Sequence, residues 1–133
     1  MHAPSSTARH ALHLLTATGA MTLAVTFAGE SLAQAAPAKQ VYKDYAASQF
    51  RSSAQFECLD QLWEAESNWT PTAQNPTSTA YGIAQFLDAT WASTGIAKTS
   101  DPFLQIDAGL IYIDERYGTS CAAWSFHQAN NWY

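Results

Sequence analysis

One carboxyl group in this sequence stands where general acid catalysis would need it. If the segment around it is a helix, Glu66 lies on the same face as four apolar side chains, those of Leu59, Leu62, Trp63 and Trp69. A carboxyl group held against apolar surface is costly to ionise, so we expect its pKa to be raised. A raised pKa keeps the proton on the acid near neutrality, as a general acid requires. The alternative is a glutamate at a helix end whose carboxylate reaches past the last turn into water.

Polar and flexible residues follow Glu66 within a short stretch. Ser67 comes directly after it, where it would either orient the carboxyl group or cap the end of the helix. A loop rich in Thr, Asn, Pro and Ser leads to a segment that contains Gly82 and Gln85. A glycine lets the backbone approach a ligand closely and adopt positive φ, and a glutamine amide can both donate and accept hydrogen bonds. Taken singly, Gly82 is better explained by a turn and Gln85 by an exposed helix position.

The order and spacing of these residues resemble the first two motifs of the SLT-type lytic transglycosylases, members of the lysozyme-like superfamily that cleave peptidoglycan. In that family a helix ends in Glu-Ser, the Glu is the only catalytic carboxylate, and a Gly-hydrophobic-x-Gln segment lines the sugar groove. The resemblance implies that Glu66 is catalytic and that Ser67 is its neighbour at the site. It also implies that Gly82 and Gln85 line the groove.

The resemblance continues into the C-terminal part of the chain, with one departure. The stretch from Cys121 to Gln128 and the final Trp132-Tyr133 are similar to a small secreted branch of the family, so the similarity covers roughly residues 50–133. Many members carry an Ala-Tyr-Asn motif late in the domain, and nothing in this chain matches it clearly. The residue that lines this wall of the groove is therefore left open.

A single carboxylate suffices for the chemistry that the resemblance implies. Most glycosidases use two, but Glu64 falls on the polar face of its helix, and Asp88, Asp101 and Asp107 are accounted for by helix caps and helix faces. In the family the Glu protonates the glycosidic oxygen while the N-acetyl group of muramic acid assists departure. The same Glu then activates the muramic acid's own hydroxyl. The expected product is an anhydro-muramyl sugar, formed without a metal or an organic cofactor.

Aromatic side chains are concentrated in the C-terminal half of the sequence. Flat rings pack on the apolar faces of sugars, so some of these residues are candidates for the groove, with Tyr81 as the first choice, although core packing is the ordinary role of most of them. The set is Tyr81, Trp124, Phe126, Trp132 and Tyr133. His127 titrates near neutrality and could assist at the site, the alternative being a structural or exposed histidine. The candidate substrate-binding residues are therefore Ser67, Tyr81, Gly82, Gln85 and His127.

Three functions stay open, and an enzyme is the leading one. The expected activity is that of a secreted peptidoglycan lytic transglycosylase that cleaves the MurNAc-GlcNAc bond. A hydrolytic muramidase of the same fold would instead leave a free reducing end. A non-catalytic wall-binding or assembly module would make Glu66 incidental. The intact Glu66-Ser67, followed by Gly82 and Gln85, argues against such a module, whereas the missing Ala-Tyr-Asn motif argues for it.

Residues 1–35 are expected to be a signal peptide. Arg9 precedes a mostly apolar stretch, residues 11–28, that contains no acid, Lys or Arg, and Ala33-Gln34-Ala35 supplies the small-x-small pattern of a cleavage site. The alternative is a retained transmembrane anchor, but threonines interrupt the stretch and make it weakly hydrophobic for a span. We expect cleavage after Ala35, a location outside the cytoplasm, either secreted or in the cell envelope, and no membrane attachment afterwards.

The charge and the missing motifs exclude several classes of partner. The formal net charge is −5, and cleavage would remove one base, Arg9, and one acid, Glu30, without changing it. An acidic chain is unsuited to nucleic acid or an anionic membrane surface as its main partner. With no Gly-rich phosphate loop, CxxC pair or His-x-x-x-His spacing, the sequence predicts neither a nucleotide cofactor nor a metal site. We expect a monomer that recognises peptidoglycan strands through a groove.

The two cysteines of the sequence, Cys58 and Cys121, both lie beyond the signal segment. In an exported chain an even pair is read first as a disulfide, and the alternative is two free thiols in a reducing compartment. The predicted bridge would tie the first firm helix to the last one. Closing a loop of this length contributes roughly 4 kcal/mol in the chain-entropy model.

The remaining pattern predicts an all-α fold, a small lysozyme-like helical domain over residues 51–133 with a loop-lined substrate groove. Residues 36–50 read as a polar N-terminal leader that turns helical near Tyr42. Helices are expected from about Ser53 to Asn68, from about Ile83 to Ser93, from Asp101-Pro102 to Tyr117, and from Ser120 onward. The third of these carries an apolar stripe expected to be core: Phe103, Ile106, Leu110, Ile113 and Tyr117.

Overall fold

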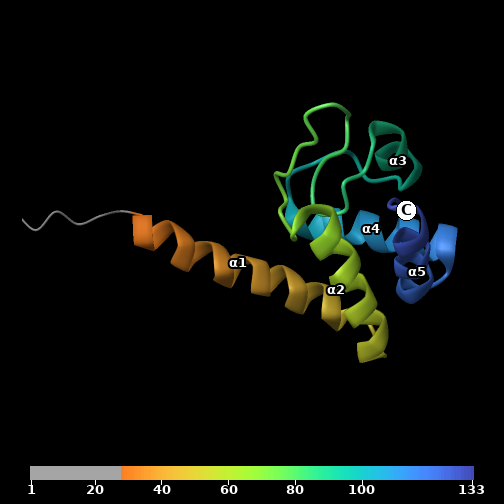
Figure 1. Cartoon of the computed structure of the whole chain (residues 1–133), viewed down its shortest axis with the longest axis horizontal. Coiled ribbons are helices and arrows are strands. Elements are labelled where there is room, and N and C mark those ends of the chain that lie inside the picture. Colours follow the sequence, from red (N-terminus) through yellow and green to blue (C-terminus); the bar gives the residue numbers. More distant parts are fainter. Residues whose placement is uncertain (1–27) are drawn as a thin grey trace, which may run out of the picture.

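The computed structural model describes residues 28–133, which form five helices (Figure 1). They are α1 (Ala28–Ser48), α2 (Ser53–Ser67), α3 (Asp88–Ser93), α4 (Pro102–Tyr117) and α5 (Ser120–Asn130). Within the described residues the only β pairing consists of isolated bridges. The prediction of an all-α domain is therefore confirmed.

The predicted signal peptide lies largely outside the described residues. Residues 1–27 are not described, and residues 28–35 belong to α1. Among the helices of residues 28–133, none combines the length and the apolar character that a membrane crossing needs. Export and cleavage after Ala35 stay predictions.

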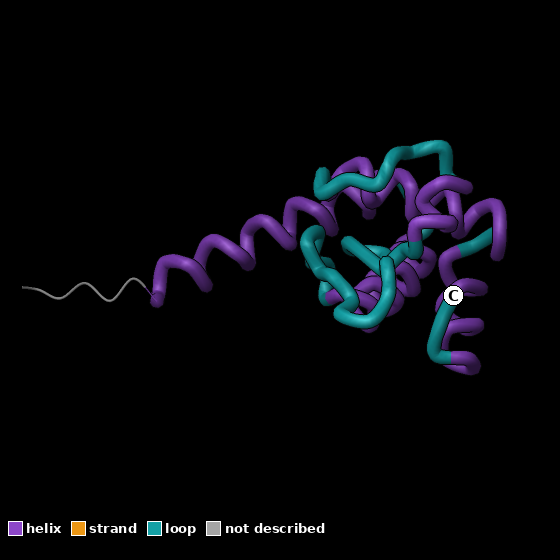
Figure 2. Tube along the Cα trace, turned by 90° about the horizontal axis from the view of Figure 1, so that it is seen from above, coloured by secondary structure: helices purple, strands orange, loops and turns teal. Residues whose placement is uncertain are grey.

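Helix α1 is longer than the sequence predicts. The pattern indicates a leader that turns helical near Tyr42, whereas α1 is continuous to Ser48 and includes Pro37. Figures 1 and 2 show its N-terminal half extending away from the other helices, while its C-terminal half packs against α2 and α4. Ala46 is fully buried in that packing. The long-range contacts that hold the segment are not visible in its local sequence.

Ion pairs join α1 to the polar face of α2. Lys43 Nζ lies 2.7 Å from Asp60 Oδ1 and 2.7 Å from Glu64 Oε1, and Lys39 Nζ lies 2.7 Å from the same Glu64 oxygen. Glu64 lies on the polar face of its helix, as the sequence predicts, and is paired there with two lysines. Hydrogen bonds from Lys39 and Lys43 hold the pKa of Glu64 below its usual value.

The apolar face of α2 forms the centre of the core. Leu59, Leu62 and Trp63 are fully buried, and so is Trp69 just beyond the helix end. Gly109 of α4 packs directly on Trp63, since a Cβ at Gly109 would lie 2.3 Å from Trp63 Cζ2. Only a glycine at this position lets the two helices approach so closely, and this contact fixes how α4 lies against the helix that carries Glu66.

The predicted limits of α4 are confirmed. The Asp101 carboxylate accepts hydrogen bonds from the backbone N–H groups of Phe103 and Leu104, at 2.9 and 3.2 Å, and Pro102 occupies the first turn. This arrangement satisfies N–H groups that have no partner within the helix. Gly118 ends the helix at φ 77°, a conformation that glycine adopts without strain.

The apolar stripe of α4 is core at four of its five predicted positions. Ile106 and Ile113 are buried, and Leu110 and Tyr117 are partly buried against the same cluster. Phe103 is the exception, with 37% of its surface exposed. It lies near the start of α4, where Tyr45 of α1 covers it in part, with the two ring centroids 5.0 Å apart.

The helix predicted from Ile83 begins later, at Asp88. Gly82 at φ 84° and Gln85 at φ 52° both lie in the left-handed region, which a continuous α-helix excludes. Tyr81 instead forms isolated antiparallel bridges with Gln74 and Phe86. The segment between α2 and α3 is therefore an irregular loop whose conformation depends on contacts with the rest of the domain.

Gln105 of α4 is the main anchor of this loop. It is buried, and its Oε1 accepts the Ile83 N–H at 2.8 Å while its Nε2 donates to the carbonyls of Pro71, at 2.7 Å, and Thr99, at 2.8 Å. A Cβ at Gly82 would lie 2.7 Å from the Gln105 side chain. One amide thus satisfies backbone groups of three loop segments, and it fills the space left by the glycine.

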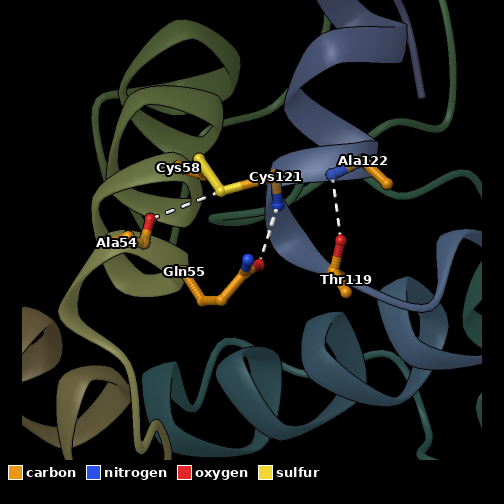
Figure 3. Close-up of a disulfide and its surroundings, with 6 residues drawn as sticks. All are labelled: Ala54, Gln55, Cys58, Thr119, Cys121 and Ala122. Carbon is orange, nitrogen blue, oxygen red and sulfur yellow. Dashed lines mark hydrogen bonds between the residues drawn. A yellow bond between two sulfur atoms is a disulfide. The ribbon is translucent and has the colours of Figure 1, made fainter.

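The predicted disulfide is present and joins α2 to α5 (Figure 3). The Cα atoms of Cys58 and Cys121 are 4.9 Å apart. Next to the bridge, the Cys121 N–H donates to Gln55 Oε1 at 3.1 Å, so a polar contact also links the two helices. Thr119 caps α5 by accepting the Ala122 N–H at 3.1 Å.

Candidate active site

The carboxyl group of Glu66 is enclosed near the C-terminal end of α2. Only 17% of its side-chain surface is exposed, and burial raises its pKa to about 7. Glu64, on the same helix, pairs with the lysines of α1 and has its pKa lowered. The pKa values of the two carboxyl groups are therefore shifted in opposite directions. Glu66 is desolvated without a permanent positive charge beside it, whereas Glu64 is paired with two ammonium groups.

His127 of α5 is the polar neighbour of Glu66. Its Nε2 lies 3.0 Å from Glu66 Oε1, and 16% of the histidine side chain is exposed. The ring stacks on Trp124, with centroids 5.4 Å apart and planes 18° apart. Burial lowers the pKa of His127 while it raises that of Glu66, so both shifts favour a neutral acid beside a neutral imidazole.

The packing of α2 against α5 brings these two residues together. Cys58 lies about two turns before Glu66 on α2, and Cys121 lies almost two turns before His127 on α5. The disulfide therefore fixes one end of the helix pair, and the contact between Glu66 and His127 forms near the other.

A cavity of about 330 Å³ opens beside Glu66. This volume is at the lower end of the range for small-molecule sites, roughly 300–1,000 Å³. Its walls come from the end of α2, the loop before α3, α3 itself and the segment after α5. The lining residues are Glu66, Ala84, Gln85, Phe86, Leu87, Thr90, Asn131, Trp132 and Tyr133.

A second cavity, of about 290 Å³, lies at the opposite end of the pair α2 and α5. Phe50, Leu110 and Ile113 supply apolar walls, and Asp114 is the one charged side chain among its lining residues. It contains no buried acid beside a histidine. The chemistry therefore points to the cavity at Glu66.

The predicted groove residues reach this cavity to different extents. Gln85 lines it, but its Nε2 already donates to the carbonyls of Ala73, at 3.0 Å, and Gly82, at 2.8 Å. Ser67 is not a lining residue. Its Oγ donates to the Ile83 carbonyl at 2.7 Å and accepts the Thr70 N–H at 3.2 Å, which ties the loop to the end of α2.

Tyr81 and Gly82 also lie outside the lining of the cavity. The space left open by Gly82 is taken by the Gln105 amide, so the close approach that this glycine permits is inside the protein. Lys98 Nζ lies over the Tyr81 ring, 5.5 Å from its centroid, in a cation–π contact. The structure thus places Glu66 and Gln85 in the wall of one cavity and His127 against Glu66, whereas Ser67, Tyr81 and Gly82 are not among the lining residues.

The segment after α5 contributes residues that motif reasoning did not assign to the site. Asn131 ends the helix at φ 59°, and the chain then turns back toward α2. The Tyr133 hydroxyl accepts the Trp63 Nε1–H at 2.9 Å and donates to the Ala84 carbonyl at 3.1 Å. Burial raises the pKa of this phenol well above its ordinary value, so it stays protonated. The aromatic pair Trp132-Tyr133 was a signal in the sequence, but its position depends on this turn.

Comparison with known proteins gives a family match. The family model described as "Transglycosylase SLT domain" matches residues 44–130. No curated protein and no solved structure matches the chain. The family match includes both Glu66 and His127, and it ends just before Asn131. Among residues 28–133, no group of three or more His, Cys, Asp or Glu side chains is arranged to hold a metal ion.

Proposed function

Because the chain belongs to the transglycosylase SLT domain family, we propose that it is a peptidoglycan lytic transglycosylase with Glu66 as its catalytic carboxylate. The observation that carries the proposal is the enclosed carboxyl group, with a pKa of about 7, at the wall of an open cavity. Such a group holds its proton near neutrality and can deliver it to a bound glycan. Membership of the family itself supports a glycan-cleaving enzyme that acts on peptidoglycan in the cell envelope.

In the first step, protonated Glu66 donates its proton to the oxygen of the glycosidic bond. The bond between that oxygen and the muramic acid C1 breaks, and the N-acetyl group of the same sugar stabilises the charge that develops at C1. Neutral His127, 3.0 Å from Glu66 Oε1, fixes one carboxyl oxygen and leaves the other to face the substrate. The apolar surroundings disfavour the carboxylate, so Glu66 still carries its proton near neutrality when the substrate binds.

In the second step, the Glu66 carboxylate acts as a base. It removes the proton from the muramic acid's own hydroxyl as that oxygen bonds to C1, which forms the anhydro ring and returns Glu66 to its protonated state. No water is consumed and no second carboxylate is required. Ser67 and the loop residues Tyr81, Gly82 and Gln85 would hold the groove in shape, and Gln85 is the one of these four that lines the cavity. We further propose that the mature chain acts outside the cytoplasm as a monomer, without a cofactor.

The products separate this function from its alternatives. Mass spectrometry of the fragments released from purified peptidoglycan is expected to show anhydro-muramyl ends, which are one water lighter than free reducing ends. Reducing ends would identify a hydrolytic muramidase. Binding without the release of any fragment would identify a wall-binding module.

The pH dependence of cleavage should follow Glu66. Because burial raises its pKa to about 7, the acid form persists up to that pH in the free enzyme. We expect kcat/KM to decline above about pH 7, approaching a tenfold loss for each further pH unit. Rates measured on soluble glycan fragments across pH 5 to 9 would check this. Glu64→Gln is the matched control, and its kcat/KM should decline above the same pH as that of the wild type. A decline that begins near pH 4.5 would contradict the assignment.

A further inference from the structure

We propose that the segment Asn131–Tyr133, together with Arg116 of α4, forms a subsite for a sugar that carries a carboxylate. The inference rests on the proposed function, because peptidoglycan combines N-acetylated sugars with acidic lactyl and peptide substituents. It goes further by assigning Asn131–Tyr133, which lie beyond the end of the family match, together with Arg116, which lies within it. Three features carry it: how the segment is held, what Trp132 presents, and the charge beside it.

The segment is anchored at both of its ends. The Asn131 N–H donates to the His127 carbonyl at 2.7 Å, which closes the turn after α5. Tyr133 is bonded to Trp63 of α2 and to Ala84 of the loop, so its ring points inward. The residue between these two anchors, Trp132, is consequently held in position and directed outward.

Trp132 presents a preformed aromatic surface next to the acid. It lines the same cavity as Glu66, and 50% of its surface is exposed. Phe126 packs edge-to-face against it, with centroids 4.8 Å apart and planes 82° apart. A large exposed indole that is held by its neighbours can pack on the apolar face of a sugar without losing much side-chain freedom. A sugar placed there would lie beside Glu66.

Arg116 places a positive charge at this surface. Its guanidinium lies 5.5 Å from the centroid of the Trp132 ring, and its Nε donates to the Tyr117 hydroxyl at 3.2 Å. Within residues 28–133, no carboxylate forms an ion pair with it. Arg116 is not itself a lining residue of the cavity, but its guanidinium lies over the ring of Trp132, which is. In a chain of net charge −5, an arginine over an exposed indole matches a sugar with an acidic substituent.

Binding in an inactive background tests the assignment without relying on turnover. The protein would be the mature chain with Glu66→Gln. The probes would be a neutral tetramer of β-1,4-linked N-acetylglucosamine and acidic glycan strands from which the stem peptides have been removed, so that the lactyl carboxylates are free. Trp132→Ala is expected to raise Kd for both probes by at least about tenfold. Arg116→Gln is expected to raise Kd about 3- to 10-fold for the acidic strands alone, and the difference should shrink as salt increases.

Matched variants exclude trivial causes. Leu104→Ala removes a similarly exposed apolar side chain of α4, outside the cavity, and should leave both affinities unchanged. Arg51→Gln makes the same change in net charge elsewhere and should also be neutral. Trp132→Tyr keeps a ring and should keep most of the binding. If Trp132→Ala binds both probes with unchanged Kd, the assignment of Trp132 as a sugar-binding surface is wrong. If Arg116→Gln weakens both probes equally, or Arg51→Gln has the same effect, the assignment to acidic sugars is wrong.

The two proposals can fail separately. If the wild-type chain releases no fragments but this binding pattern holds, the proposed function is wrong and the subsite stands. If anhydro products form while the binding pattern is absent, the function stands and the subsite is wrong.

Discussion

Replacing Glu66 by glutamine is expected to reduce cleavage of purified peptidoglycan by at least 10²–10⁴-fold, the usual contribution of general acid-base catalysis. The amide keeps the size and much of the hydrogen-bonding shape of the side chain, but it cannot deliver or remove a proton. In the proposed mechanism one residue does both, so both steps are lost together. The release of soluble fragments, measured at a fixed enzyme concentration, would check this.

Two comparisons make the result specific. Glu64→Gln should change turnover little, because that carboxylate pairs with Lys39 and Lys43 on the other side of α2, and losing surface ion pairs typically costs about 1 kcal/mol or less. The Glu66→Gln protein should fold. Folding raises the pKa of Glu66 from 4.5 to about 7, so the native state binds more protons than the unfolded chain within that window.

It follows that wild-type stability falls as pH rises from about 4.5 to 7, and the variant lacks this loss. The free energy of unfolding, measured with denaturant at pH 5 and at pH 8, should therefore be higher for the variant relative to the wild type at pH 8 than at pH 5. A folded Glu66→Gln protein that keeps most of its activity would refute the assignment, as would a Glu64→Gln protein that loses it.

Removing the disulfide should have the largest effect on stability. The bridge between Cys58 and Cys121 closes a separation of 63 positions. In the chain-entropy model such a loop is worth about 4 kcal/mol. The double variant Cys58→Ala/Cys121→Ala is thus expected to melt about 15–30 °C below the wild type, as measured by thermal unfolding of the mature domain.

Reduction provides the matched control for that variant. Wild-type protein treated with a thiol reductant should melt close to the double variant, and the reductant should not change the variant itself. A reduced wild type that melts within a few degrees of the oxidised protein would show that the bridge contributes little. We also expect the double variant to cleave peptidoglycan more slowly than the wild type even at temperatures at which it is still folded. The reason is that the bridge holds together the two helices whose other ends carry Glu66 and His127.

The parts of this fold that the sequence predicts are those governed by local chemistry. The start of α4 follows from Asp101 and Pro102, and its end from Gly118, because caps act within one turn. The enclosed position of Glu66 follows from helical periodicity in α2, and the disulfide from the pairing of two cysteines in a chain expected to be exported.

Other features depend on distant partners, so the sequence could name candidate residues but could not place them. The first turn predicted from Ile83 gives way to a loop because Gln105, more than twenty residues later, binds its backbone. The approach of His127 to Glu66 depends on the angle between two helices, which no local pattern encodes. The same holds for Trp132, whose place in the cavity wall requires the turn at Asn131 and the buried anchor of Tyr133.

The contact between Gly82 and Gln105 limits how this sequence can change over time. Any larger residue at position 82 would meet the amide, and any shorter residue at position 105 would leave the Ile83 N–H and the Pro71 and Thr99 carbonyls without their partner. Neither position can drift by itself, and a second substitution at the other does not repair the first, because the amide's hydrogen bonds are lost in either case. The two residues therefore behave in evolution as one inherited unit, although α3 and the loops on either side of it separate them along the chain.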